Sequence, residues 1–156
     1  MKAAIHAITM LAALLLAACS EPSSVQVLNS RVTARMSPVQ PCNRPASVEY
    51  LPNGARISIP DTALFTVGRT DLSPCGEYAV ASVVEAMLES RIMQVVIEPG
   101  GDINAPDAFL PRERVGILRT SLSNPGFRPT PPAVLVQPAA VPSRVWGIVL
   151  TIPRSG

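Results

Sequence analysis

Histidine and lysine are almost absent from this chain, since each occurs once, as His6 and Lys2. Both lie in a leader that we expect to be cleaved, so the mature chain would carry neither. Nucleophilic catalysis by a Ser–His or Cys–His arrangement would then be unavailable. The sequence also has no cysteine–histidine cluster with zinc spacing and no glycine-rich phosphate-binding pattern. We therefore expect neither an enzyme nor a bound cofactor.

Excess charge of one sign is also lacking. After cleavage, 12 arginines would oppose 11 acidic residues, which leaves a net charge of about +1. A protein that binds nucleic acid needs basic side chains clustered on one face, and these arginines are scattered along the chain. Nucleic acid is therefore not an expected partner.

The first 18 residues have the three parts of a secretory signal peptide: a basic start at Lys2, an apolar run and small residues before the cleavage point. The run is too short and too rich in alanine for a comfortable membrane span. Its end, Leu16-Ala17-Ala18-Cys19, resembles the lipobox of bacterial lipoproteins, which implies that Cys19 becomes the acylated first residue. Ser20 after that cysteine implies the outer membrane, with the domain in the periplasm. An ordinary cleaved signal with a chance cysteine is the alternative.

Two cysteines remain beyond Cys19, namely Cys42 and Cys75. An even pair in an exported chain favours a disulfide, with two unrelated buried thiols as the alternative. Residues 19–46 are rich in Ser, Pro, Gln and Val and have no sustained hydrophobic period. We expect a flexible tether there, with a short edge strand near Val25–Leu28. Pulled straight, the tether would span about 80 Å, enough to bring the domain to the cell wall.

Residues 47–156 are expected to form one folded domain. Alternating segments at Val48–Leu51 and Arg56–Ile59 flank an Asn-Gly turn signal and predict a hairpin. A helix is predicted from Ser73 to about Ser90, because apolar residues recur there with helical spacing: Val80, Val83, Val84, Met87 and Leu88.

The second half of the domain continues the alternation of strands and helices. Ile92–Glu98 is continuously β-branched, which is typical of a strand covered on both faces. Pro111 is expected to start a second helix, whose inward residues are Val115, Leu118 and Leu122. Strands follow at 133–136 and 144–152, the latter with Trp146, Ile148, Leu150 and Ile152 on one face. The expected fold is an α/β sandwich of order β-α-β-α-β-β, with two helices on a small mixed sheet.

Four stretches of this domain resemble the peptidoglycan-binding domain shared by OmpA-like and Pal-like envelope proteins. They are ISIPDTALFTVGRTDLSPCGEYAVASVVEAMLES, IMQVVIEPGGD, FLPRERVGILRTSL and RVWGIVLTI, and they span about two-thirds of the chain. The usual family pattern begins with "DxxLFxxGSxxLxPxG", continues with a strand ending "VxGHTD" and a helix opening "LSxxRA", and closes near "NRRVEI". The resemblance implies the OmpA-like fold and peptidoglycan as the partner.

The resemblance also implies a site. Asp102 matches the aspartate of the "TD" step, while Leu110 and Arg114 match the leucine and arginine of "LSxxRA". In the family this aspartate and arginine bind diaminopimelate, whose free end is zwitterionic. Asp102 would meet the ammonium group, and Arg114 would bind the carboxylate through two parallel hydrogen bonds. Arg144, at the "NRR" step, is a supporting candidate.

The predicted helix start places Arg112 and Arg114 in its first turn, where the helix dipole disfavours cations. A ligand carboxylate or Asp102 would offset that cost for Arg114, whereas Glu113 and solvent suffice for Arg112. A catalytic role for the carboxylates of Asp102 and Asp107 is not expected, because nothing evident raises either pKa.

The chain departs from the family pattern around this site. "HTD" is replaced by Gly100-Gly101-Asp102, the loop that leads to Arg114 is about three residues shorter, and the "LS" serine is Pro111. Two functions are therefore kept. The first is an outer-membrane lipoprotein that binds peptidoglycan non-covalently through diaminopimelate and ties the membrane, or an envelope complex, to the wall. The second is a degenerate domain that serves as a structural subunit of a trans-envelope secretion or conjugation complex.

Overall fold

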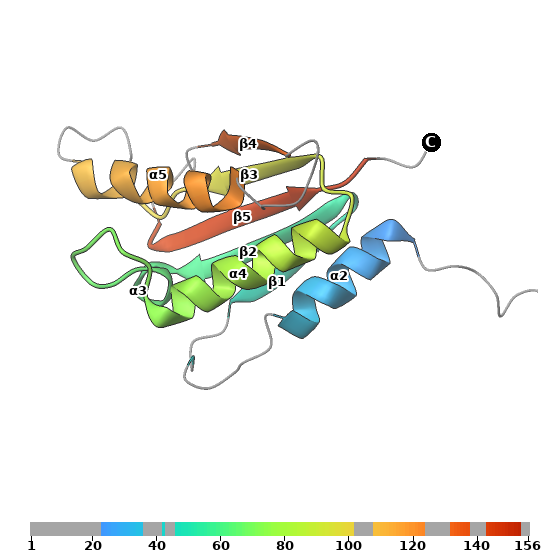
Figure 1. Cartoon of the computed structure of the whole chain (residues 1–156), viewed down its shortest axis with the longest axis horizontal. Coiled ribbons are helices and arrows are strands. Elements are labelled where there is room, and N and C mark those ends of the chain that lie inside the picture. The colour runs from blue at the N-terminus through green and yellow to red at the C-terminus, as the bar shows by residue number, and fades with distance from the viewer. Residues whose placement is uncertain are drawn as a thin grey trace, which may run out of the picture.

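The computed structural model describes residues 23–35, 42, 46–101, 108–123, 132–137 and 143–153. Within them, helices pack on one face of a five-stranded sheet (Figure 1). Among the described residues no helix is long and apolar enough to cross a membrane. The elements, in chain order, are α2 (Ser24–Arg35), β1 (Ser47–Leu51), β2 (Gly54–Pro60), α3 (Asp61–Leu64), α4 (Pro74–Glu89), β3 (Gln94–Glu98), α5 (Phe109–Ser123), β4 (Ala133–Val136) and β5 (Val145–Thr151).

The sheet has the order β1-β2-β5-β3-β4 and is mixed, because β3 and β4 are parallel while the other neighbours are antiparallel. The predicted hairpin is present, with Pro52 and Asn53 between β1 and β2. The expected mixed sheet with helices packed on it is therefore confirmed, with α2 and α3 as additional helices.

The core lies between the sheet and its helices. Three residues of the predicted inward face of α4 are buried, namely Val80, Val83 and Met87. So are Trp146, Ile148, Leu150 and Ile152 at the end of the chain. The interpretation of β3 as covered on both faces is wrong. Only its alternate residues Val95 and Ile97 are buried, because the helices cover one face of the sheet (Figure 1).

Helix α4 begins where the sequence predicts. Ser73 caps it by accepting a hydrogen bond from the Gly76 amide at 2.9 Å, and Pro74 occupies the first turn. The next residue, Cys75, is bonded to Cys42 with a Cα–Cα distance of 5.4 Å, so the expected disulfide is present. It fastens the segment that follows α2 to the first turn of α4.

The edge strand expected near Val25–Leu28 is wrong, since these residues belong to helix α2. Ser23 and Gln26 exchange hydrogen bonds between side chain and backbone, which forms a capping box at the start of the helix. Leu28 and Val32 are fully buried in the core. Residues 24–35 of the expected tether are thus packed on the domain, while Cys19 and the signal peptide lie outside the described residues.

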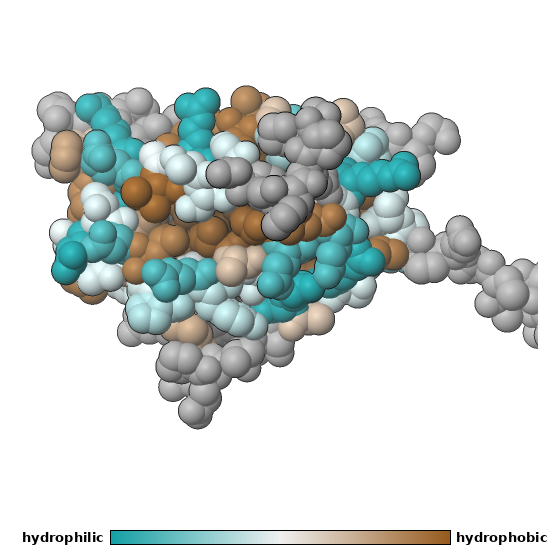
Figure 2. Space-filling view, in the orientation of Figure 1, coloured by the Kyte–Doolittle hydropathy of each residue, from teal (hydrophilic) through white to brown (hydrophobic). Residues whose placement is uncertain are grey.

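Two arginines fasten α2 to α4. Arg35 forms ion pairs with Glu85 and Glu89, and Arg31 donates to the Glu89 carbonyl. On the same side of the molecule, Figure 2 shows a band of hydrophobic residues between α5 and α4. Val84 of α4 and Val115 of α5 are only partly buried where they pack against the core.

Candidate functional site

A pocket of about 840 Å³ lies at the end of the sheet where β2 and β3 end and β5 begins. Its walls are the β2–α3 junction at 60–62, Gly100 and Gly101, the first turns of α5, and residues 143–145. This volume is in the range of small-molecule sites. The chain therefore brings together four segments that are far apart in sequence, and they include the segments singled out from the sequence.

Helix α5 supplies Arg114 from its buried side. Arg114, Leu118 and Leu122 are its buried residues, spaced four apart, so the arginine sits on the stripe that faces the core. The helix begins at Phe109, two residues earlier than predicted, which puts Arg114 in the second turn. The expected conflict with the helix dipole is therefore smaller, since that effect falls off within the first turn.

Asp61, the first residue of α3, is the partner that compensates the charge of Arg114. One guanidinium nitrogen, Nη1, donates to both carboxylate oxygens of Asp61, at 2.8 and 3.0 Å. The other nitrogens donate to the backbone, Nε to the Arg69 carbonyl at 2.8 Å and Nη2 to the Thr66 carbonyl at 3.1 Å. The Arg114 side chain is only 6% exposed, so a ligand that takes its charge has to compete with Asp61.

Two aromatic side chains complete this ion pair. The Trp146 indole donates through Nε1 to Asp61 Oδ1 at 2.8 Å. Phe65 lies under the guanidinium, 4.7 Å from the arginine Cζ to the ring centroid, and also packs on Trp146 at 5.1 Å. Asp61 therefore accepts from two buried donors, and the pair is part of the core as much as of the pocket wall.

Gly100 accounts for one departure from the family pattern. A Cβ placed at this glycine would lie 2.5 and 2.6 Å from the Cδ1 and Nε1 atoms of Trp146. The indole thus occupies the space that a side chain at position 100 would need. Gly100, which stands where the family pattern has the histidine of "HTD", thus leaves room for the tryptophan that donates to Asp61.

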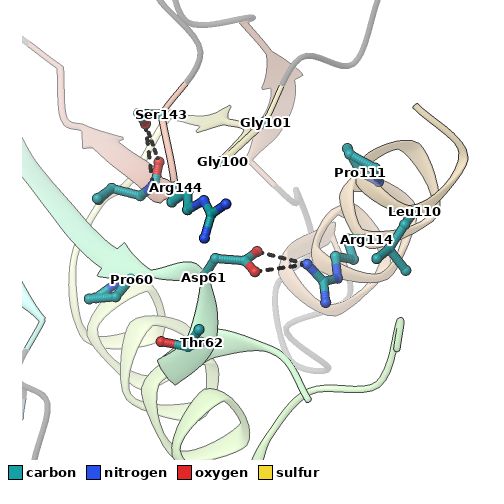
Figure 3. Close-up of a pocket in the computed structure, with 11 residues that line it drawn as sticks. Pro60, Asp61, Thr62, Gly100, Gly101, Leu110, Pro111, Arg114, Ser143 and Arg144 are labelled. Carbon is teal, nitrogen blue, oxygen red and sulfur yellow. Dashed lines mark hydrogen bonds and ion pairs between the residues drawn. The ribbon is translucent and has the colours of Figure 1, made fainter. Parts of the chain in front are cut away.

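Arg144 is the accessible cation of the pocket. Its backbone carbonyl accepts from the Asp61 amide at 2.8 Å, which ties the start of β5 to α3. Its side chain is exposed and points into the pocket toward Asp61, which lies between Arg144 and Arg114 (Figure 3). Because Asp61 and Arg114 neutralise each other, Arg144 leaves the described part of the pocket with one positive charge in excess.

The structure thus places three of the predicted residues, Leu110, Arg114 and Arg144, around one pocket. Asp102 lies outside the described residues, so its pairing with Arg114 around a ligand stays a prediction. Asp61 was missed as a site residue, although it is the aspartate of the "DxxLF" step. That motif signalled the family but not the residue's contacts, because its partner is 53 positions away.

No protein-family model and no curated protein matches this chain. Several solved structures do match it in fold. A putative MotB-like protein from Desulfovibrio vulgaris is 15% identical with a TM-score of 0.55, and the match covers 83% of this chain and 92% of that one. The cell wall anchor of the T6SS from Pseudomonas aeruginosa is 11% identical with a TM-score of 0.51, covering 86% and 100%.

A third match is the periplasmic domain of Helicobacter pylori MotB, which is 10% identical with a TM-score of 0.51, covering 69% of this chain and 79% of that one. At such low identities the matches show the fold alone. This chain has the OmpA-like fold of MotB-type periplasmic domains, as its sequence motifs predict.

Proposed function

We propose that this protein is an outer-membrane lipoprotein that binds peptidoglycan non-covalently through the pocket at the end of the sheet. The observation that carries the proposal is the position of Arg144, an exposed cation directed into a pocket whose other described charges neutralise each other. A solved structure of the same fold is named as a cell wall anchor, which supports a wall ligand. Cys19, the cysteine of the lipobox, carries the acyl chains that anchor the protein in the membrane.

The finer proposal is that the ligand is the diaminopimelate residue of the stem peptide. Its free end carries an ammonium and a carboxylate on one carbon, so it suits a site that combines an exposed arginine with an aspartate. Arg144 binds the carboxylate through two guanidinium N–H groups. Asp102, which directly follows the pocket residue Gly101, accepts from the ammonium. Arg114 remains bound to Asp61 and holds two sides of the pocket together, without adding to its net charge.

Co-sedimentation with purified sacculi tests this proposal. The full-length protein in mild detergent is expected to pellet with sacculi, whereas Arg144→Ala and Asp102→Ala remain mostly in the supernatant. Arg119→Ala is the matched control, because Arg119 is exposed on α5 and its removal changes the net charge equally. If Arg144→Ala pellets as well as Arg119→Ala does, the pocket is not the wall site.

The alternative is a structural subunit of a trans-envelope complex. The observation that favours it is the engagement of Arg114, whose charge is already taken by Asp61 within the protein. This reading predicts that stoichiometric partner proteins stay bound when the protein is purified after the wall has been digested. It also predicts that Arg144→Ala leaves that complex intact.

A further inference from the structure

The point where the chain enters the domain lies at the opposite end from the pocket. Helix α2 starts beside the end of α4 and the end of β5, and a small groove of about 240 Å³ there is lined by Ser24, Val27, Arg31, Arg91 and Ile152, with Glu89 and Ser90. Helix α4 runs between the two ends (Figure 1). Its 16 residues correspond to a length of about 24 Å.

Only residues 20–22 separate Cys19 from Ser23, where the described helix begins its capping box. Four Cα–Cα steps span at most about 14 Å. Cys19, on which the proposed function places the acyl chains, therefore has its Cα within about 14 Å of that of Ser23 whenever α2 is packed on the core. The long reach that a fully flexible tether would give is lost, because α2 runs back along α4.

The groove end also has the side chains of a surface that rests on lipid headgroups. Arg91 is exposed and has no partner among the described residues, and Met93, two residues further along the chain, is an apolar side chain with 61% exposure. The one acidic residue of the groove, Glu89, is already engaged by Arg31 and Arg35. An exposed arginine and an exposed methionine in one short segment, close to an acyl anchor, suit an interface where phosphate and hydrocarbon meet.

We propose that this end, defined by Ser24, Arg31, Arg91 and Met93 and called here the anchor end, contacts the phosphate headgroups of the membrane in which Cys19 is anchored. The domain then stands on the membrane with its pocket directed away from it. This inference rests on the proposed acylation of Cys19 but not on the identity of the pocket's ligand.

Two introduced cysteines test the orientation. Met93→Cys at the anchor end and Phe109→Cys at the pocket end replace two exposed apolar residues, with 61% and 71% exposure. Cys42 and Cys75 are bonded to each other and Cys19 is acylated, so a thiol-reactive fluorophore labels only the new cysteine. The full-length lipidated protein is reconstituted in phosphatidylglycerol vesicles that contain a lipid with a nitroxide headgroup, which quenches fluorophores near the surface.

The expected result is loss of most fluorescence at position 93 and almost none at position 109. Arg91→Glu is expected to reduce the quenching at position 93, whereas Arg119→Glu on α5 leaves it unchanged. Equal quenching at the two positions, or more at position 109, overturns the inference.

The results distinguish a failure of the membrane anchor, of the orientation and of the wall-binding proposal. If the protein does not float with the vesicles, acylation of Cys19 fails and this inference fails with it. If it floats but shows equal quenching, only the orientation is wrong. If position 93 is quenched while the protein does not pellet with sacculi, the anchor end is supported and the wall-binding proposal is overturned.

Discussion

Asp61 and Arg114, 53 positions apart, form an ion pair under the pocket in which one guanidinium nitrogen donates to both carboxylate oxygens. The arginine is nearly buried, whereas a quarter of the aspartate side chain is exposed. The pair joins α3 to α5 and thereby holds two walls of the pocket together. Its first role is therefore structural. Because its two charges cancel, the charge that a ligand meets in the described part of the pocket is that of Arg144.

Removing Asp61 should leave Arg114 buried without its counter-charge and Trp146 without its acceptor. We expect Asp61→Ala to lower the free energy of unfolding by about 3–5 kcal/mol, the usual cost of breaking a buried pair. Urea unfolding followed by fluorescence measures it. Asp71→Ala is the control, because the Arg69–Asp71 pair is exposed and should contribute at most about 1 kcal/mol. Similar losses in the two variants would contradict a structural role for Asp61.

Substitution of Gly100 should displace the chain's single tryptophan. In Gly100→Ala the new methyl group would overlap the indole of Trp146, so the side chain has to move and its hydrogen bond to Asp61 is lost. We expect a destabilisation of about 1–3 kcal/mol together with a red shift of the tryptophan emission. The matched variant Gly116→Ala on α5 has open space for its methyl group and should gain up to about 1 kcal/mol. An unchanged emission spectrum in Gly100→Ala would show that the indole does not occupy that space.

Helix α2 should behave as part of the folded domain. Leu28 is fully buried, so Leu28→Ala is expected to cost about 2–5 kcal/mol in the free energy of unfolding. Ser30→Ala, on the exposed side of the same helix, should have little effect. Denaturant midpoints compare the two variants. If residues 24–35 were instead a flexible tether in solution, the two variants would have the same denaturant midpoint.

Binding to sacculi should depend on salt if Arg144 acts through its exposed charge. The screening length falls from about 10 Å at 0.1 M to about 3 Å at 1 M salt, so the bound fraction should fall over that range. Arg144→Lys keeps the charge but not the two parallel hydrogen bonds, and is expected to bind more weakly than the wild type but better than Arg144→Ala. Binding that is insensitive to salt and to both substitutions would argue against this residue.

The sequence was sufficient for the parts of the fold that depend on one periodic pattern. The faces of α4 and β5 follow from apolar spacing, and the start of α4 follows from Ser73-Pro74, because these are local effects. Helix α2 was missed although Ser23 and Gln26 form a capping box and Leu28 and Val32 are four apart. Two buried positions in a polar segment are a weak signal until the surface that covers them is known.

The site was predicted only in part, because a motif can indicate a residue but not its contacts with distant parts of the chain. A family motif indicated Arg114, and the structure places it with Arg144 and Leu110 around one pocket. Its pairing with Asp61 and the position of the Trp146 indole depend on contacts across the whole domain, which no local pattern encodes. Whether Asp102 completes the site stays a prediction.

The disulfide should contribute substantially to stability. It closes a loop of 33 residues, for which the chain-entropy model gives about 3–4 kcal/mol. Cys42→Ser and Cys75→Ser are each expected to lose that amount, and the double variant should lose no more than either single one. Urea unfolding of the oxidised and reduced wild type checks the same quantity. Equal midpoints with and without reductant would show that the bond adds nothing.

The disulfide also determines how the protein carries tension. Under the proposed anchor at Cys19, a pull strong enough to detach α2 reaches Cys42 and passes through the bond into the first turn of α4. Strand β1, which pairs only with β2 and lies inside the closed loop, is bypassed. An edge strand can be unzipped one hydrogen bond at a time, whereas a helix packed along its length has to be sheared off at once. The cross-link therefore transfers the mechanical load from the edge strand β1 to helix α4, whose buried face packs in the core.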